Sequence, residues 1–243
     1  MARHAAGITI RPYEGRDREA VRAINLRTAW RNRGYAAMLN DPVAHADYWT
    51  LYFTDHRPEA SWVVERDGVM IGYFLGCTDQ AHFLRVMKTR IVPRVAARAI
   101  WKSLTRQYDA RSRAYVRHMI LKGPGETPDF PFLDYPAHYH CNILRAGYGQ
   151  NLYTTMALMF CDRLDALGVA RMHGSMLEPA GSAAFPRMIA AFGQENVEAY
   201  AEKPTRLFEA VLGDTRPMVN RVWGASVPRF RRYFEWMRDH ARM

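Results

Sequence analysis

A strand, a tight loop and a helix follow one another in the middle of the sequence, and this succession constrains the fold most. Residues 137–144 have the composition of a strand, and residues 145–149 form a short loop with two glycines. From 152 to 167 apolar residues recur with a period of 3.6, as on one face of a helix. Gly168 follows at the position where a glycine commonly ends a helix. The chain is therefore expected to be an α/β protein.

The rest of the sequence continues this alternation of strands and helices. Asp67-Gly68 separates two apolar runs and is a strong signal for a hairpin turn. The expected elements are a strand at 8–11, a helix after Asp17, strands at 61–65 and 69–75, a helix after Pro93, a strand at 169–176, a helix at 182–192, a last strand at 207–212 and a helical tail.

Composition narrows the class of protein. Of 243 residues, 49% are hydrophobic and 24% are charged, which is typical of a globular chain. No apolar run approaches the roughly 18 residues that a membrane helix requires, and Met1–Gly7 lacks the apolar core of a signal peptide. The three cysteines have neither disulfide-framework nor zinc-site spacing. We therefore expect a cytoplasmic protein that does not span a membrane and binds no metal.

The net charge of +10 is concentrated in two segments. Residues 85–117 hold ten Lys or Arg and one acid, and residues 216–243 hold seven Arg and two acids. In the first segment four basic residues are spaced to stack along one helical face, namely Arg94, Arg98, Lys102 and Arg106. This basic stripe could be a solvated face, or could bind an acidic partner such as an acyl carrier protein; nucleic acid is not expected, because interleaved aromatics and known motifs are lacking. The tail could pack on the core, form a homodimer or touch a membrane surface.

Two motifs carry a resemblance to a known family. The run Gly72-Tyr73-Phe74-Leu75-Gly76-Cys77-Thr78-Asp79 and the later run Tyr135-Pro136-Ala137-His138-Tyr139-His140 are separated by an insert that contains Trp101. Together with the order of elements, they resemble the GNAT superfamily of N-acetyltransferases, and in particular bacterial relatives of the acetyltransferase-like domain of O-GlcNAc hydrolases. The resemblance covers about residues 8–193.

The resemblance implies a fold and a domain organisation. The fold class is α/β (α+β), the GNAT fold, with a mixed central sheet whose splayed fourth strand is residues 137–144, flanked by helices. Residues 1–200 would form the acyltransferase-like domain, with a basic helical insert at about 80–134. Residues 201–243 would add a last strand and a basic helical C-terminal extension.

The resemblance also implies an activity, the transfer of an acetyl or other acyl group from coenzyme A to the primary amine of a small molecule such as an amino sugar. Acetyl-CoA or another acyl-CoA would be the co-substrate. Two alternatives stay open: an acyltransferase that uses an acyl carrier protein or a long-chain donor, and a non-catalytic GNAT-fold binding protein.

In this family the fourth strand and the loop and helix start after it bind the coenzyme, because a helix start offers unpaired N–H donors. The residues at the matching positions here are Asn142, Ile143, Leu144, Gly147, Tyr148, Gly149, Gln150, Asn151, Leu152 and Tyr153. The sequence departs from the family loop. A gapless match places Asn151 and Tyr153 where the family has glycines, whereas a match with a deletion places Gly147 and Gly149 there.

The candidate catalytic residues are His140, His138 and Asp79. Side chains alternate along a strand, so His138, His140 and Asn142 are expected to share one face. Either histidine could deprotonate an amine, or both could be structural. Asp79, which follows a predicted strand, could hold the ammonium or a hydroxyl of the substrate, or could cap the insert.

Overall fold

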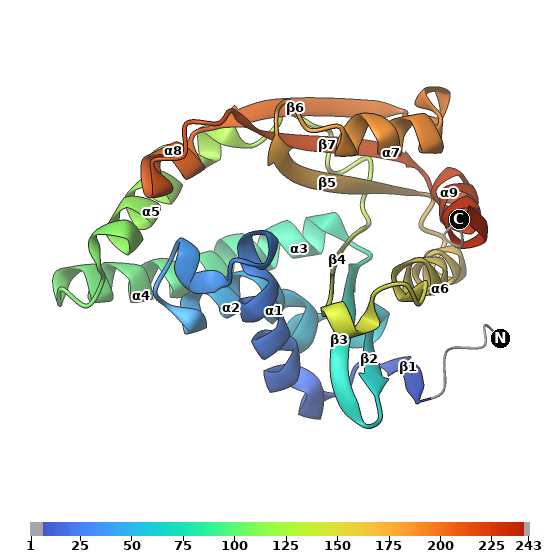
Figure 1. The fold of residues 1–243 in the computed structure, drawn as a ribbon, viewed down its shortest axis with the longest axis horizontal. Helices are drawn as coiled ribbons and strands as arrows, with labels where there is room; N and C mark the ends of the chain where they lie inside the picture. Colours follow the sequence, from blue (N-terminus) through green and yellow to red (C-terminus); the bar gives the residue numbers. More distant parts are fainter. Residues whose placement is uncertain (1–6, 241–243) are drawn as a thin grey trace.

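The computed structural model describes residues 7–240 (Figure 1). Residues 1–6, on which the signal-peptide argument rests, lie outside the described residues. The strands are β1 (Ile8–Pro12), β2 (Ser61–Arg66), β3 (Val69–Cys77), β4 (His138–Ile143), β5 (Arg171–Pro179), β6 (Ala199–Thr205) and β7 (Met218–Ser226). The helices are α1 (Arg18–Asn32), α2 (Pro42–Leu51), α3 (Gln80–Val86), α4 (Val92–Leu104), α5 (Ala110–Leu121), α6 (Leu152–Ala166), α7 (Ala184–Phe192), α8 (Leu207–Leu212) and α9 (Val227–His240). None of these helices is long and apolar enough to cross a membrane.

The strands form two antiparallel sheets, with the orders β1-β2-β3-β4 and β5-β7-β6. A single parallel bridge between Ala137 and Met172 joins them. Beyond this bridge β4 and β5 diverge (Figure 1). The sequence-based expectation of a splayed fourth strand is therefore confirmed, and the sheet is mixed only through this bridge.

The predicted hairpin between β2 and β3 is also confirmed. Asp67 and Gly68 both have positive φ, 51° and 76°, as a tight two-residue turn requires. A β-bulge between Val64 and Glu65 then shifts the register of the two strands. This hairpin sets β3 beside β4, so that Leu75 is opposite His140 and Cys77 is opposite His138.

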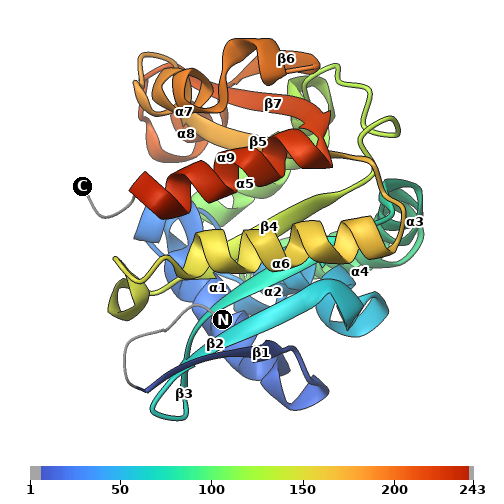
Figure 2. The same ribbon diagram turned by 90° about the vertical axis from the view of Figure 1, so that its right-hand side faces the viewer.

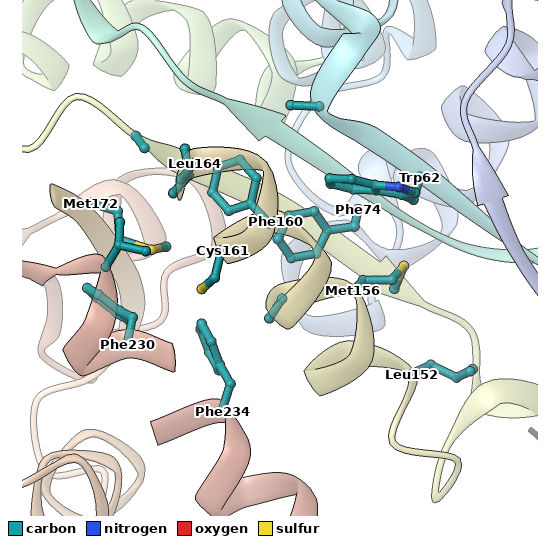
Figure 3. Close-up of a cluster of buried hydrophobic side chains, with 14 of the residues drawn as sticks. Trp62, Phe74, Leu152, Met156, Phe160, Cys161, Leu164, Met172, Phe230 and Phe234 are labelled. Carbon is teal, nitrogen blue, oxygen red and sulfur yellow. The ribbon is translucent and has the colours of Figure 1, made fainter. Parts of the chain in front are cut away.

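Helices α6 and α9 cover one face of the splayed region. Figure 2 shows α9 running alongside α6, between α6 and α7. Figure 3 shows the core that they share: Phe160 of α6 lies against Phe74 of β3, with ring centroids 5.4 Å apart, and Phe230 and Phe234 of α9 point toward Cys161 of α6. All five side chains are buried, which fixes α9 on α6.

The structure corrects the expected C-terminal part. The strand predicted at 207–212 is helix α8, because its apolar residues recur at helical spacing and Gly213 ends it with a φ of 68°. The strands here are β6 and β7, and β7 is the central strand of the second sheet. Residues after 200 therefore complete the second sheet, and α9 packs on α6.

The insert is attached to α2 by the basic stripe. Asp41, which is fully buried, accepts hydrogen bonds from Arg98 at 2.8 Å and Tyr108 at 3.0 Å, and pairs with Lys102 at 3.3 Å. Asp47, also buried, pairs with Arg94 at 3.2 Å. The predicted alignment is correct for Arg94, Arg98 and Lys102, all of which pair with carboxylates of the same chain. It is wrong for Arg106, which lies beyond the end of α4 with a φ of 54°.

Candidate functional site

Strand β4 presents its two sets of side chains to different surroundings, as its sequence predicts. Tyr139, Cys141 and Ile143 pack against the core beneath α6. His140 and Asn142 face the opposite side, toward α1 and α2. The odd-numbered residues of β4 thus form a face that packs on the core, and His140 and Asn142 lie on the polar face.

The edge of β4 that faces β5 is open. Leu144 donates its N–H to Ile71 of β3, so even-numbered residues of β4 face β3 and odd-numbered ones face the other edge. On that edge Ala137 accepts from the N–H of His173, at 2.9 Å. Within residues 7–240, no strand pairs with this edge beyond Ala137. The backbone groups of Tyr139, Cys141 and Ile143 are therefore available to an extended ligand.

A cavity of about 220 Å³ lies in this splayed region, and we call it the His140 cavity. It is formed by α1, α2, β4, β5 and α8, whose lining residues are Asn25, Thr28, Ala29, Trp30, His45, Trp49, His140, Asn142, Leu177 and Phe208. Two members of this set were predicted as site residues, His140 and Asn142. The cavity residues of α1 and α2 belong to no sequence motif, so the sequence alone could not identify them.

Three buried polar atoms without hydrogen-bond partners belong to residues of this cavity. Among the described residues, none bonds to Oδ1 of Asn25, Nε1 of Trp30 or Nδ1 of His140. A buried polar atom without a partner costs roughly 1–3 kcal/mol, and such atoms are rare in folded proteins. Three of them around one cavity indicate a site for a ligand that has both hydrogen-bond donors and acceptors.

A hydrogen-bond network fixes the polar wall of the cavity. The amide of Asn142 lies 2.6 Å from the hydroxyl of Tyr73 and 3.3 Å from Nε2 of His140. Asn25 donates to the same hydroxyl at 3.1 Å. Burial raises the pKa of Tyr73, which keeps this hydroxyl neutral. With Nε2 beside the amide, Nδ1 is the nitrogen of His140 that is left for a ligand.

Burial keeps both histidines of the cavity uncharged at neutral pH. Burial lowers the pKa of both His140 and His45 to about 4. The nearby His140 also lowers the pKa of His45. No Asp or Glu lines the cavity among the described residues. The site is therefore polar but without charge, and a charged ligand group would have to enter it in its neutral form.

The structure places the other two predicted catalytic residues elsewhere. His138 is enclosed by aromatic rings, with the centroids of Phe83 and His173 at 4.8 and 5.0 Å, and it does not line the cavity. Asp79 caps α3, since its carboxylate accepts the N–H of His82 at 2.9 Å. These are the structural alternatives that the sequence left open for both residues.

The loop after β4 has one close-packed and one open glycine. A Cβ on Gly147 would lie 2.5 Å from Ile143, so this glycine is required for packing. Gly149 has a φ of 75° and open space around it. Tyr148 is exposed, Gln150 is half-buried, and Leu144 packs against the second core cluster. Gly149 therefore precedes α6 and has open space beside it in which an anion would fit.

The first turn of α6 is open to an anion at its end. Asn151, with a φ of 54°, precedes the helix and makes no side-chain cap. Its side chain instead donates to the backbone carbonyl of Arg238 in α9, at 3.4 Å. Leu152 is buried, and its backbone is part of the turn whose N–H groups point outward. The helix start fits the pyrophosphate of a coenzyme.

The path from this helix start along β4 is covered by α9. Tyr153 is half-buried and hydrogen-bonds through its hydroxyl to that of Tyr139. Phe234 of α9 packs on both rings, with centroids 5.9 Å from Tyr153 and 6.5 Å from Tyr139. The residues therefore fit a coenzyme at its phosphate end, and entry of its arm requires that α9 leave α6.

Comparison with known proteins was made for the sequence and for the structure. No protein-family model matches the sequence, and no curated protein matches it. The structure is similar to the crystal structure of SsHAT, with a TM-score of 0.61 and 24% sequence identity over 91% of this chain and 98% of that chain. It is also similar to a mutant of agmatine N-acetyltransferase in its apo form, with a TM-score of 0.51 and 13% identity over 90% and 99% of the two chains. The chain therefore has the GNAT fold, as the sequence predicts.

Proposed function

We propose that the protein is an N-acyltransferase that moves an acetyl or other acyl group from coenzyme A to the primary amine of a small molecule. The observation that carries this proposal is the set of three unpartnered polar atoms in the His140 cavity, next to the open backbone edge of β4. The fold adds support, because a splayed fourth strand is what the family uses to hold an acyl thioester. An amino sugar is the acceptor that the sequence resemblance suggests.

The cavity would bind the amine in its neutral, nucleophilic form. An apolar site that lacks carboxylates lowers the pKa of an ammonium group. Oδ1 of Asn25 can then accept an N–H of the amine. Nε2 of His140 accepts from the amide of Asn142, so Nδ1 carries the ring hydrogen and can donate to an oxygen of the acceptor molecule, while the proton released on attack goes to water. The low pKa of His140, about 4, keeps the imidazole neutral at neutral pH, as this donor role requires.

The backbone would polarise the carbonyl that the amine attacks. When bound, the coenzyme supplies an activated acyl thioester. The N–H groups of Tyr139 and Cys141 on the open edge of β4 are donors already fixed in place, and fixed donors stabilise the oxyanion that develops at such a carbonyl. The N–H groups at the start of α6 would hold the phosphates, and α9 would have to move aside.

The proposal is tested by acyl transfer to a panel of primary amines, with acetyl-CoA and longer acyl-CoAs as donors and product detection by mass spectrometry. We expect His140→Phe to lower kcat/KM about tenfold, because it removes a fixed hydrogen-bond donor from the acceptor site. His82→Gln is the control, since His82 lies outside the cavity. Failure of every amine and donor pair to react, or equal rates for both variants, would refute the proposal.

A second candidate function, a non-catalytic binding protein, is favoured by the position of α9. Hydrogen exchange of residues 227–240 with and without millimolar acetyl-CoA separates the two. The acyltransferase requires faster exchange in α9 when the coenzyme binds, because its arm and Phe234 compete for one place. Unchanged exchange together with no turnover would establish the binding protein instead.

A further inference from the structure

A second, larger cavity lies inside the insert. Its volume is about 480 Å³, within the range of about 300–1,000 Å³ that small-molecule sites occupy. It is enclosed by α2, α4, α5 and the turn after α5. Figure 1 shows α4 beside α2, with α5 rising from the far end of α4. The insert thus builds a chamber, which we call the insert cavity.

The walls of the insert cavity are apolar and uncharged. They include Val92, Val95, Ala99, Val116, Met119 and Ile120, and no Asp, Glu, Lys or Arg of the described residues. Two tyrosines of the wall, Tyr48 and Tyr115, are half-buried, and the loss of contact with water raises the pKa of each hydroxyl, so both stay neutral. Such walls favour hydrocarbon over any charged group.

Small residues of α4 create the space, and ion pairs outside it hold its shape. Ala96 and Ala99 face the cavity, whereas Arg98 and Lys102 of the same helix pair with the buried Asp41 of the α2 side. The helix is therefore fixed at a distance from α2 that its alanines do not fill. A collapsed core would have placed larger side chains there.

The insert cavity lies next to the His140 cavity. His45 and Trp49 of α2 line both, and the ring centroids of Trp49 and His140 are 5.6 Å apart. A molecule whose polar end lies at His140 can therefore extend an apolar part past Trp49 into the insert.

We propose that the insert cavity binds an unbranched alkyl chain whose polar end lies in the His140 cavity. The inference rests on the proposed function for the identity of that end, and the chain can belong either to the acyl group or to the amine. The uncharged apolar walls of the insert cavity, and the walls that it shares with the His140 cavity at His45 and Trp49, determine the class of ligand. The insert is then the specificity element of the fold.

The test measures binding, so that it does not depend on turnover. Calorimetry with n-alkylamines and with n-alkyl carboxylates of two to ten carbons gives the dependence of Kd on chain length for each head group. Burial of a methylene favours binding by an amount that corresponds to about a three- to fourfold lower Kd per carbon. We expect this slope in one series, and that series identifies the source of the chain.

Variants of α4 test whether the dependence of Kd on chain length arises in the insert cavity. Ala96→Phe fills the chamber and should abolish the gain beyond the shortest chains, while Ala97→Phe, at the exposed neighbouring position, should keep it. Val95→Ala enlarges the insert cavity and should extend the gain in affinity to longer chains. This variant tests the proposal independently in case Ala96→Phe does not fold. Flat slopes in both series, or an unchanged slope in Ala96→Phe, overturn the proposal. If short amines are acylated but Kd does not depend on chain length, the alkyl-chain proposal fails and the proposed function stands. If Kd falls with chain length but no amine is acylated, the proposed function fails and the alkyl-chain site stands.

Discussion

Lowering the pH from 7.5 to 5.5 should destabilise the protein through its buried histidines. Burial lowers the pKa of His45, His140 and His173 to about 4 in the folded state, against an ordinary value of about 6.5 in the unfolded chain. Between these values the unfolded state binds protons that the folded state does not. The free energy of unfolding therefore falls as the pH drops below about 6.5, and it stops falling near pH 4.

The size of the effect follows from the separation of the two pKa values. From pH 7.5 to 5.5 each histidine contributes somewhat more than 1 kcal/mol, so the three together remove about 4 kcal/mol. Burial also lowers the pKa of His138 well below its usual range, which adds in the same direction. A loss of this size is a large part of the 5–15 kcal/mol by which domains are usually stable.

Urea denaturation at the two pH values, followed by circular dichroism, measures this loss. The carboxylates do not confound it, because Asp17, Asp41 and Glu126 have lowered pKa values and stay ionised at pH 5.5. His173→Gln removes one of four contributing histidines and should reduce the pH-dependent loss by about 1 kcal/mol, roughly a quarter, whatever it does to stability at pH 7.5. A loss below about 1 kcal/mol, or no reduction in the variant, would refute the argument.

Two further predictions concern the attachments of the insert and of α9. Asp41→Ala leaves Arg98 and Lys102 without their buried partner and should lower the free energy of unfolding by about 3–5 kcal/mol in urea denaturation. By contrast, Asp214→Ala, which removes the partner of the exposed Arg216, should change it by less than about 1 kcal/mol. Phe234→Ala removes a buried ring from α9 and should cost about 3–5 kcal/mol, yet it should tighten acetyl-CoA binding measured by calorimetry, and weaker binding would contradict the inferred competition.

Local pattern predicted most of the elements around the site. The alternation along β4, the Asp67-Gly68 turn and the 3.6-residue period of α6 are properties of neighbouring residues, and the structure reproduces each of them. The strand expected at 207–212 was wrong because an apolar run of six residues does not distinguish a strand from a short helix. Strand β7 was missed because its arginine had been counted with the basic tail.

The site itself was predictable only in part. His140 and Asn142 were found from the strand pattern, but Asn25, Trp30, His45 and Trp49 reach the cavity through the packing of α1 and α2 on β4. The same limit applies to the basic stripe. Its spacing predicts a shared helical face, which the structure confirms for Arg94, Arg98 and Lys102, whereas their partners Asp41 and Asp47 lie about fifty residues earlier in the chain. Long-range partners of this kind leave no periodic signal in the sequence.

The two basic additions are attached by different forces, and this difference determines which of them can move. The insert is held by ion pairs to carboxylates that are almost fully buried, so separating it from α2 would leave uncompensated charges in the interior. The ion pairs of α9 with α6, from Arg231 to Asp162 and Asp165, involve exposed carboxylates and are each worth about 0–1 kcal/mol. What holds α9 is the burial of its apolar face, in which Phe230 and Phe234 contribute about 2–3 kcal/mol each and Val227, Tyr233 and Met237 pack beside them. A ligand present at about a thousand times its intrinsic Kd gains about 4 kcal/mol, which is less than this whole face contributes. The proposed coenzyme should therefore shift only part of α9, and only at high concentration, whereas the insert and its apolar chamber stay in place.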